Sequence, residues 1–462
     1  MTAILLRAGT VLSHEGDSVR VLRDHDVLII GNTIAAIGQG LSLPNDRLDG
    51  RIIDCRGKIV SPGFIDTHHH LWQSQLRGRF GNLGFMDYMV AGNLQSFNYT
   101  PEDISGGNWQ AKEAIRASAS SGLRIVFCYT PIWRIKSWSS DAPIEFENEL
   151  LPEWWYATLE ELARSAPFGD ARVTLALGFD DFNLPKETVQ DLWARCRALG
   201  ISLFTTHFVA HFMKNSITLL KDYSLLDSTT LFSHLNGIAP SDKDTLLAHG
   251  AHFSSTPETE LQMGLGEPVA FTPDPELRSR ASIGIDCHAN NSADILTQLR
   301  LGMQHARGVE NTAALAAAAY PRLRIKLEEV FNLGTIQGAR AIGMGDILGS
   351  VEVGKRADIV VFDAESPAMA CAGEESPLAA VVLHANVGDL CTVIVDGVVR
   401  KERARVGDVR VLGRGDGGEG EGEVLSQKQV LEQLLASRER IIERGKEQDP
   451  QRGMEFLHRT FA

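Results

Sequence analysis

Both ends of the chain alternate apolar and polar residues, which is the pattern of β-strands with one buried face. Residues 1–57 show it, and Gly31-Asn32 separates two of the runs as a hairpin turn does. Further runs lie between residues 357 and 405, where Asp396-Gly397 marks another turn. Neither end has enough strands to bury a sheet face alone. We therefore predict that residues 1–57 and 357–405 form one composite β-sandwich.

Residues 58–356 change to short apolar runs separated by amphipathic helices, a pattern typical of parallel strands joined by helices. A long parallel sheet usually closes into a TIM-like (β/α) barrel, so we predict an α/β fold with a barrel here. No apolar run ending in a polar residue lies between Trp72 and Ser121, so the barrel is expected to lack one strand or to contain a disguised one. The seven candidate strands are residues 59–66, 123–129, 173–179, 201–206, 230–234, 251–255 and 281–286.

The last region, residues 406–462, differs from both. Residues 413–423 are rich in Gly and Glu and too polar to fold alone. Beyond them, apolar residues from Val430 to Ile442 recur at helical spacing among charges. We predict a linker and a C-terminal helix that packs within the subunit or across a dimer, and we expect a homo-oligomer.

Charge and composition narrow the classes of partner. The net charge of −14 disfavours nucleic acid, and no run reaches the roughly 18 apolar residues that span a bilayer. The first residues lack a secretory pattern, and the six cysteines have no paired spacing. We expect a cytoplasmic enzyme with a small-molecule substrate and neither nucleic acid nor membrane as partner.

Histidine and aspartate stand where several of the candidate strands end. His68 and His70 follow the first run and, being one residue apart, point the same way. His207, His234 and Asp286 end three other runs, and the carboxyl ends of parallel strands meet at one rim. Imidazole and carboxylate groups suit zinc, and also iron or manganese. The alternatives are a hydrogen-bonded polar pair for the first two histidines and a helix cap for Asp286.

Three segments resemble signatures of the amidohydrolase superfamily: residues 61–70 (SPGFIDTHHH), 338–343 (GARAIG) and 349–360 (GSVEVGKRADIV). The resemblance covers about residues 4–399 and favours the branch with cytosine and guanine deaminases and triazine hydrolases or chlorohydrolases. It implies one divalent metal ion held by His68, His70, His207 and Asp286, with His234 beside the metal-bound water. No lysine ends the run at 173–179, so nothing resembles the carboxylated lysine of the binuclear members.

The function expected from these residues is hydrolysis of a non-peptide C–N bond in a small cyclic or aromatic substrate. The cation makes hydroxide available for attack on an sp² carbon, Asp286 takes the proton, and His234 polarises the substrate or orients the water. The alternatives are a metal-dependent decarboxylase or isomerase and a catalytically silent barrel.

Some positions differ from the deaminases that the chain resembles, and others are candidates for contact with the substrate. Ala210 replaces their proton-shuttling glutamate, and the adjacent His211 is a candidate substitute. Gln73 matches in position a glutamine with which guanine deaminases read a purine, and Trp72 is a candidate wall for a flat ring. Glu258 and Glu260 follow the run at 251–255, where they either bind a polar substrate group or lie in a solvated loop.

Overall fold

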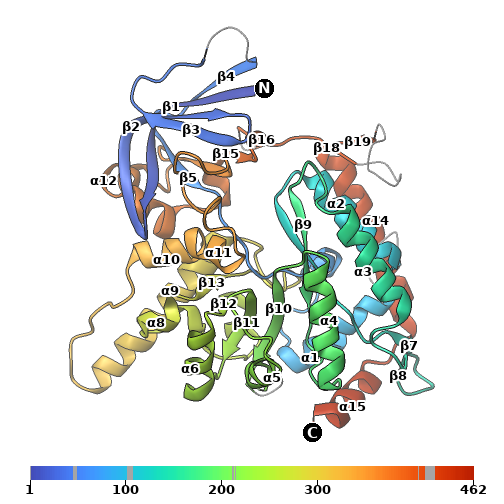
Figure 1. Ribbon diagram of the computed structural model, residues 1–462. Coiled ribbons are helices and arrows are strands. Elements are labelled where there is room, and N and C mark those ends of the chain that lie inside the picture. The colour runs from blue at the N-terminus through green and yellow to red at the C-terminus, as the bar shows by residue number, and fades with distance from the viewer. Residues whose placement is uncertain are drawn as a thin grey trace.

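The structure is a computed structural model that describes residues 2–44, 49–100, 108–210, 213, 215–403, 405–411 and 422–461. Two large sheets organise these residues, one antiparallel for the most part and one parallel. Figure 1 shows the first sheet at one end of the molecule and the second in the middle. No described helix is both long and apolar enough to cross a bilayer.

The first sheet has nine strands and contains segments from both ends of the chain. Its order is β17-β16-β15-β14-β5-β1-β2-β3, and β4 pairs with β1. Ile30 pairs with Thr33 and Val395 with Val398, which confirms the two predicted turns. Both ends therefore share one sheet, whereas its folding into a two-layered sandwich stays a prediction. The strands are β1 (Thr2–Glu15), β2 (Ser18–Ile30), β3 (Thr33–Gly38), β4 (Asp49–Asp54), β5 (Lys58–Pro62), β14 (Ile359–Asp363), β15 (Leu390–Val395), β16 (Val398–Glu402) and β17 (Arg405–Val406).

The second sheet is a curled half-barrel of six strands in the order β13-β12-β11-β10-β9-β6. All five pairs of neighbouring strands are parallel. Six of the seven predicted runs lie on these strands: β6 (Ile125–Tyr129), β9 (Val173–Gly178), β10 (Phe204–Val209), β11 (Thr230–Asn236), β12 (His252–Ser255) and β13 (Ala281–Ile283). The helices that follow them in the chain are α3 (Glu153–Ser165), α4 (Lys186–Ala198), α5 (Ser216–Asp222), α6 (Pro240–His249), α7 (Pro257–Gln262), α8 (Pro275–Arg278) and α9 (Ile295–Ala316).

The prediction that residues 59–66 form the first barrel strand is wrong, because their strand belongs to the first sheet. Within residues 59–66, β5 (Lys58–Pro62) pairs with β1 and β14 of the first sheet, where it is buried on both faces. A run that is apolar on both faces fits the middle of either sheet, so its pattern does not say which one it joins. The chain then continues beside β13, where the Thr67 amide donates to Ile283 O (3.0 Å) and the Ile285 amide to His68 O (3.0 Å).

The half-barrel is open on the side of β6. Between β5 and β6 the described residues contain no strand; they form η1 (Leu71–Leu76), α1 (Phe85–Ala91), η2 (Asn93–Asn98) and α2 (Asn108–Ser121). Six strands plus the segment after β5 are fewer than the eight of a closed barrel. The gap lies where the sequence lacked a second strand.

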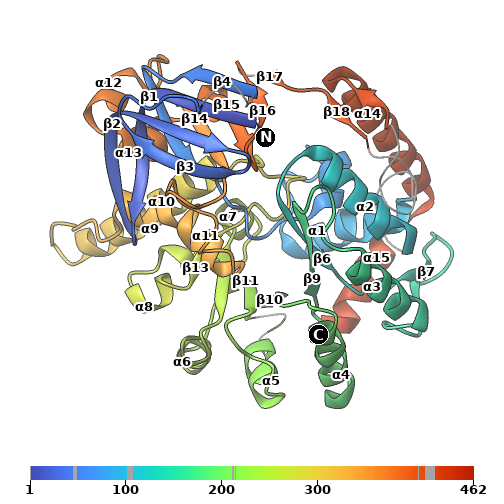
Figure 2. The same ribbon diagram turned by 45° about the horizontal axis from the view of Figure 1, so that its top comes forward.

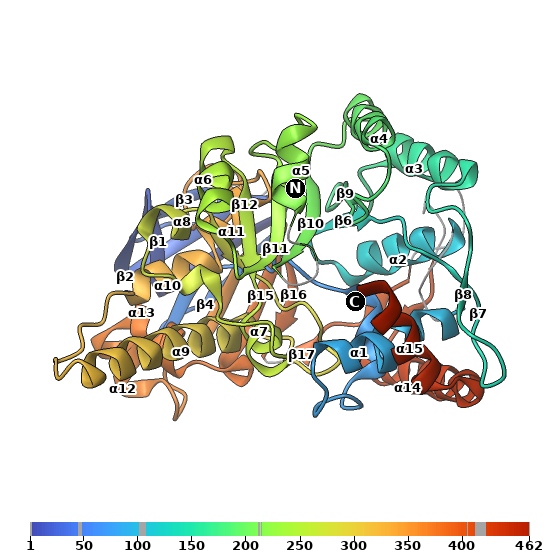
Figure 3. The same ribbon diagram turned by 90° about the horizontal axis from the view of Figure 1, so that it is seen from below.

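The C-terminal region packs against this open side of the same subunit. Its helices are α14 (Gln427–Arg444) and α15 (Pro450–Phe461); most of the predicted linker lies outside the described residues. Figure 2 shows both helices on the same side of the molecule as α2 and α3, and Figure 3 shows α15 beside α1. The helix α15 contacts α1, while α14 contacts η1 and η2. Gln75 Nε2 donates to Ser437 Oγ (3.3 Å), and Trp138 Nε1, from the loop after β7 (Ile135–Ser137), donates to Asp449 O (3.1 Å).

Candidate metal centre

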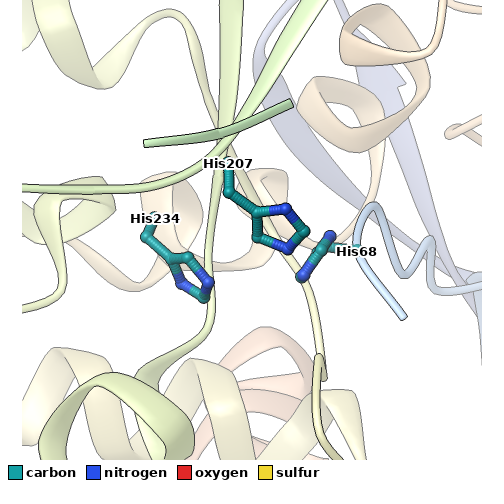
Figure 4. Close-up of side chains that lie close together, drawn as sticks. All are labelled: His68, His207 and His234. Carbon is teal, nitrogen blue, oxygen red and sulfur yellow. The ribbon is translucent and has the colours of Figure 1, made fainter. Parts of the chain in front are cut away.

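Five of the predicted site residues converge at the carboxyl end of the half-barrel. His207 lies on β10 and His234 on β11, while Asp286 follows β13 and His68 and His70 lie in the segment beside it. One ligand atom from each of His68, His207 and His234 lies within 4.8 Å of the other two, and the same holds for His68, His70 and Asp286. Figure 4 shows the three imidazoles of the first group facing one another. Because both groups contain His68, they surround one place.

Asp286 joins the two histidines of the segment after β5. Its Oδ1 is 3.2 Å from His68 Nε2 and 3.1 Å from His70 Nε2. Burial would raise the pKa of Asp286, but the close imidazoles of His68 and His70 hold that pKa well below its ordinary value. Asp286 also has φ 63°, a left-handed conformation that is costly for a residue with a Cβ and is found at functional sites.

The remaining nitrogens of two histidines are held by protein groups. His207 Nδ1 is 2.9 Å from Asp180 Oδ2, and His68 Nδ1 is 2.8 Å from Ser233 Oγ. Outer partners of this kind orient the rings of metal-binding histidines. Asp180 was missed in the sequence, although it directly follows the run at 173–179. In these two rings Nε2 is therefore the nitrogen left for a ligand.

The donor set fits a divalent cation. His68 Nε2 is buried and lies 3.2 Å from Asp286 Oδ1, but it has no partner among the described residues with the geometry of a hydrogen bond. Burial lowers the pKa of His68 to about 3, so the imidazole is neutral at pH 7 and keeps a lone pair on one nitrogen. A buried lone pair beside an ionised carboxylate is an arrangement that a cation completes.

His234 is fully enclosed and held from behind. Its Nδ1 is 3.1 Å from Thr256 Oγ1 and 3.4 Å from Glu260 Oε1, and both partners have 0% exposure. Burial lowers the pKa of His234 to about 4, so this imidazole is also neutral at pH 7. His234 and Leu235 have φ values of 80° and 69°, a second stretch of left-handed backbone at the rim.

The other predicted site residues have different surroundings. Gln73 is buried, and its Oε1 has no hydrogen-bond partner within the described part of the chain. Trp72 packs edge-on against Tyr99 in an apolar cluster with Leu76. His211 lies outside the described residues. The substrate roles of Gln73 and Trp72 stay predictions.

Three other residues have contacts that bear on the sequence predictions. His69, which lies between the two ligand candidates in the chain, bonds Asp66 Oδ2 (2.9 Å) and stacks on His288. Glu258 accepts hydrogen bonds from Ser292 and Gln298, and Glu260 is buried against His234. The solvated-loop alternative is therefore wrong for Glu260.

Known proteins share this arrangement of the chain. Residues 59–401 match the model of the amidohydrolase family. The chain is 24% identical over 433 residues to a 5-methylthioadenosine/S-adenosylhomocysteine deaminase of Desulforamulus reducens, covering 86% of this chain and 93% of that protein. It superposes on an adenosine deaminase from Xanthomonas campestris with bound zinc (TM-score 0.73, 18% identity, 96% of this chain and 99% of that chain). A mutant of atrazine chlorohydrolase from Arthrobacter aurescens, complexed with zinc and atraton, gives a TM-score of 0.73 at 20% identity, with 95% and 100% covered.

Proposed function

Because the chain belongs to the amidohydrolase family, we propose that it is a metal-dependent hydrolase of a non-peptide C–N bond in a small cyclic substrate. The convergence of His68, His70, His207, His234 and Asp286 at one rim is the observation that carries this proposal. The deaminases among its relatives support the reaction class. Cleavage of such a bond adds water, leaves oxygen on the ring carbon and releases ammonia or an amine.

We assign one divalent ion, with zinc as first choice, to His68, His70, His207 and Asp286. The buried lone pair of His68 Nε2 and the position of Asp286 Oδ1 between two imidazoles support this set. Zinc in two similar folds supports the choice of metal. When bound, such an ion lowers the pKa of a water molecule and makes hydroxide available at neutral pH.

The protein's own groups then move the protons. Asp286 is ionised in its surroundings and takes a proton from the attacking water. His234 is neutral and faces the same place, so it polarises the substrate or receives the second proton. Proton return to the ring nitrogen and the departing amine falls to these two groups and to the predicted helper His211, because Ala210 has no ionisable side chain.

Aminated purines are the first substrate class to test. The relatives include deaminases of adenine-derived compounds, which supports this class. Gln73 Oε1 has no hydrogen-bond partner among the described residues, and a carboxamide oxygen accepts from the N–H edge of a ring. We keep Gln73 and Trp72 as substrate-binding candidates. The finer proposals are a two-layered sandwich from both chain ends, a cytoplasmic location and a homo-oligomer.

The test is ammonia release by zinc-loaded protein. Adenosine, 5′-methylthioadenosine, S-adenosylhomocysteine, guanine, cytosine and an aminotriazine are incubated with wild type and with Asp286→Ala. We expect stoichiometric ammonia from at least one compound with wild type and none with the variant. A zinc-loaded wild type that releases no ammonia or amine from any of them would refute the proposed reaction.

One observation favours a second function. Ala210 removes a proton donor that deamination uses, and this loss favours a decarboxylation or isomerisation at the same metal site. Carbon dioxide release from aromatic carboxylic acids, measured on the same zinc-loaded protein, distinguishes it. The other alternative, a silent barrel, predicts that neither assay gives a product.

A further inference from the structure

Behind His234 lies a carboxyl group that the proposed ligand set and the proposed proton transfers do not use. Glu260 lies on α7 and has 0% exposure. Its Oε1 accepts from the Thr256 amide at 2.9 Å and lies 3.4 Å from His234 Nδ1. Its Oε2 is buried without a hydrogen-bond partner among the described residues. Burying a carboxyl oxygen without a hydrogen-bond partner costs free energy of folding, so we expect that Glu260 serves a function at this position.

These contacts decide which nitrogen of His234 carries the proton. Glu260 Oε1 already accepts from a backbone N–H, so that oxygen carries no proton of its own. Only a protonated Nδ1 has a hydrogen to share with it. Thr256 Oγ1, 3.1 Å from the same nitrogen, is a hydroxyl that either accepts from Nδ1–H or donates to Nδ1, so it fits this tautomer without deciding it. The neutral imidazole is therefore the tautomer with hydrogen on Nδ1 and a lone pair on Nε2.

This argument holds for either charge state of the carboxyl group. Burial raises the pKa of Glu260 well above its ordinary value, which favours the neutral acid. Its acidic hydrogen then sits on Oε2, the oxygen without a partner, and Oε1 remains an acceptor. The role is thus one of orientation and does not require that Glu260 change its charge.

We propose that Glu260 is the positioning residue of His234: it holds the ring in the Nδ1–H tautomer, so that the Nε2 lone pair faces the metal centre as a proton acceptor. This inference rests on the proposed function and adds to it a residue that compensates in part for Ala210. With Nε2 as acceptor, His234 takes a proton from the attacking water or its hydroxide. The resulting imidazolium returns that proton to the departing amine, so no proton is lost or gained.

Three variants of the zinc-loaded enzyme test the role. Glu260→Gln keeps an acceptor oxygen of the same shape, whereas Glu260→Met keeps the length and removes the acceptor. Glu258→Met is the matched control, because Glu258 lies on the same helix and bonds Ser292 and Gln298 instead. Protein labelled with ¹⁵N on histidine gives the tautomer of each ring by NMR, and loss of a signal in His234→Asn assigns His234.

We expect the Nδ1–H tautomer of His234 in wild type, Glu260→Gln and Glu258→Met, and a mixture of tautomers in Glu260→Met. With a substrate from the ammonia screen, kcat of Glu260→Met should fall about 10- to 100-fold, as for outer groups that orient site histidines. Its KM and zinc content should not change, and Glu260→Gln should keep most of the turnover.

The outcomes are separable from those of the proposed function. A purely structural role would lower the melting temperature of Glu260→Met and leave the His234 tautomer as in wild type, which would overturn the inference. An Nε2–H tautomer in wild type would also overturn it. If the tautomers are as expected but no compound releases ammonia, the positioning role stands and the assigned reaction fails.

Discussion

The two sides of the half-barrel are built by different means. On the closed side, parallel strands β10 to β13 and the segment after β5 are joined by backbone hydrogen bonds. All five residues of the candidate metal centre come from this side. On the open side, segments far apart in the sequence meet through side chains, such as Asn98 Nδ2 on Gln448 Oε1 at 2.8 Å.

The difference separates two requirements of an enzyme. A metal centre needs ligand positions fixed to a few tenths of an ångström, and a backbone ladder supplies that. A substrate wall must vary with the substrate, and helices and loops held by side-chain contacts change without disturbing the ladder. We therefore expect substitutions on the closed side to affect the metal and the chemistry, and those on the open side to affect substrate binding.

The largest effect is expected at Asp286, which we place in both the ligand set and the proton transfer. Asp286→Asn keeps the shape and removes the charge. Its turnover should fall by more than the roughly 10²–10⁴-fold that acid–base help alone supplies. Initial rates of ammonia release under saturating zinc measure this. A variant that keeps a tenth of the wild-type rate would contradict the role of Asp286.

A smaller loss is expected at His234, which we place beside the ligand set. His234→Asn should reduce kcat by about 10²–10⁴-fold while zinc stays bound. His211→Asn should reduce it by less, because His211 lies four residues beyond a ligand and ends no predicted strand. Rates and zinc content of both variants are the measurement. Equal losses in the two variants, or an Ala210→Glu variant that gains rate while His234→Asn loses none, would show another proton route.

Substitution of a buried leucine on each side of the half-barrel tests whether the closed side and the open side act independently. Leu231 is buried on β11, and Leu457 is buried on α15 beside Val90. Leu→Ala at either site removes buried volume at a cost of about 2–5 kcal/mol. Leu231→Ala should lower zinc retention during dialysis, whereas Leu457→Ala should keep zinc and raise KM. If Leu457→Ala loses zinc as readily as Leu231→Ala, the two sides are not independent.

The pH dependence of the metal-free protein gives the smallest effect. Burial lowers the pKa of His68 to about 3 and of His234 to about 4, from 6.5. In acid the unfolded chain binds protons that these folded imidazoles cannot, so stability is full above pH 6.5 and falls as the pH drops toward 4. Each ring accounts for up to about 3 kcal/mol of this loss in the free energy of unfolding. Urea unfolding at pH 7, 6, 5 and 4 should show that the stability of His234→Asn falls less with pH than the stability of wild type. Identical pH dependence in the two proteins would contradict the lowered pKa of His234.

The sequence predicted the closed side well because its signals are local. A histidine or aspartate at the end of an apolar run predicts both the strand and a side chain at its carboxyl end, as for His207 and Asp286. The run at residues 59–66 went to the wrong sheet because its middle is buried on both faces. Asp180 and Glu260 were not recognised as partners because only the folded chain brings them to His207 and His234.

The open side was harder to predict for the same physical reason. Its contacts join residues far apart in the sequence, such as Gln75 and Ser437, which are 362 positions apart. No local periodicity of the sequence predicts such contacts. The helix at residues 427–444 was expected from apolar spacing, but α15 and its packing on α1 were not. The absence of one strand from the described part of the half-barrel was predictable, because a missing apolar run is itself a local signal.

The central claim, a metal ion held by His68 and its neighbours, is tested by metal content. Wild type, His68→Ala and His69→Ala are equilibrated with zinc, dialysed together and analysed by mass spectrometry for metal per chain. His69 is the matched control, because it bonds Asp66 and stacks on His288 one residue away from the ligand candidates. We predict about one zinc per chain in wild type and in His69→Ala and none in His68→Ala. A folded His68→Ala protein with full zinc content would contradict the account.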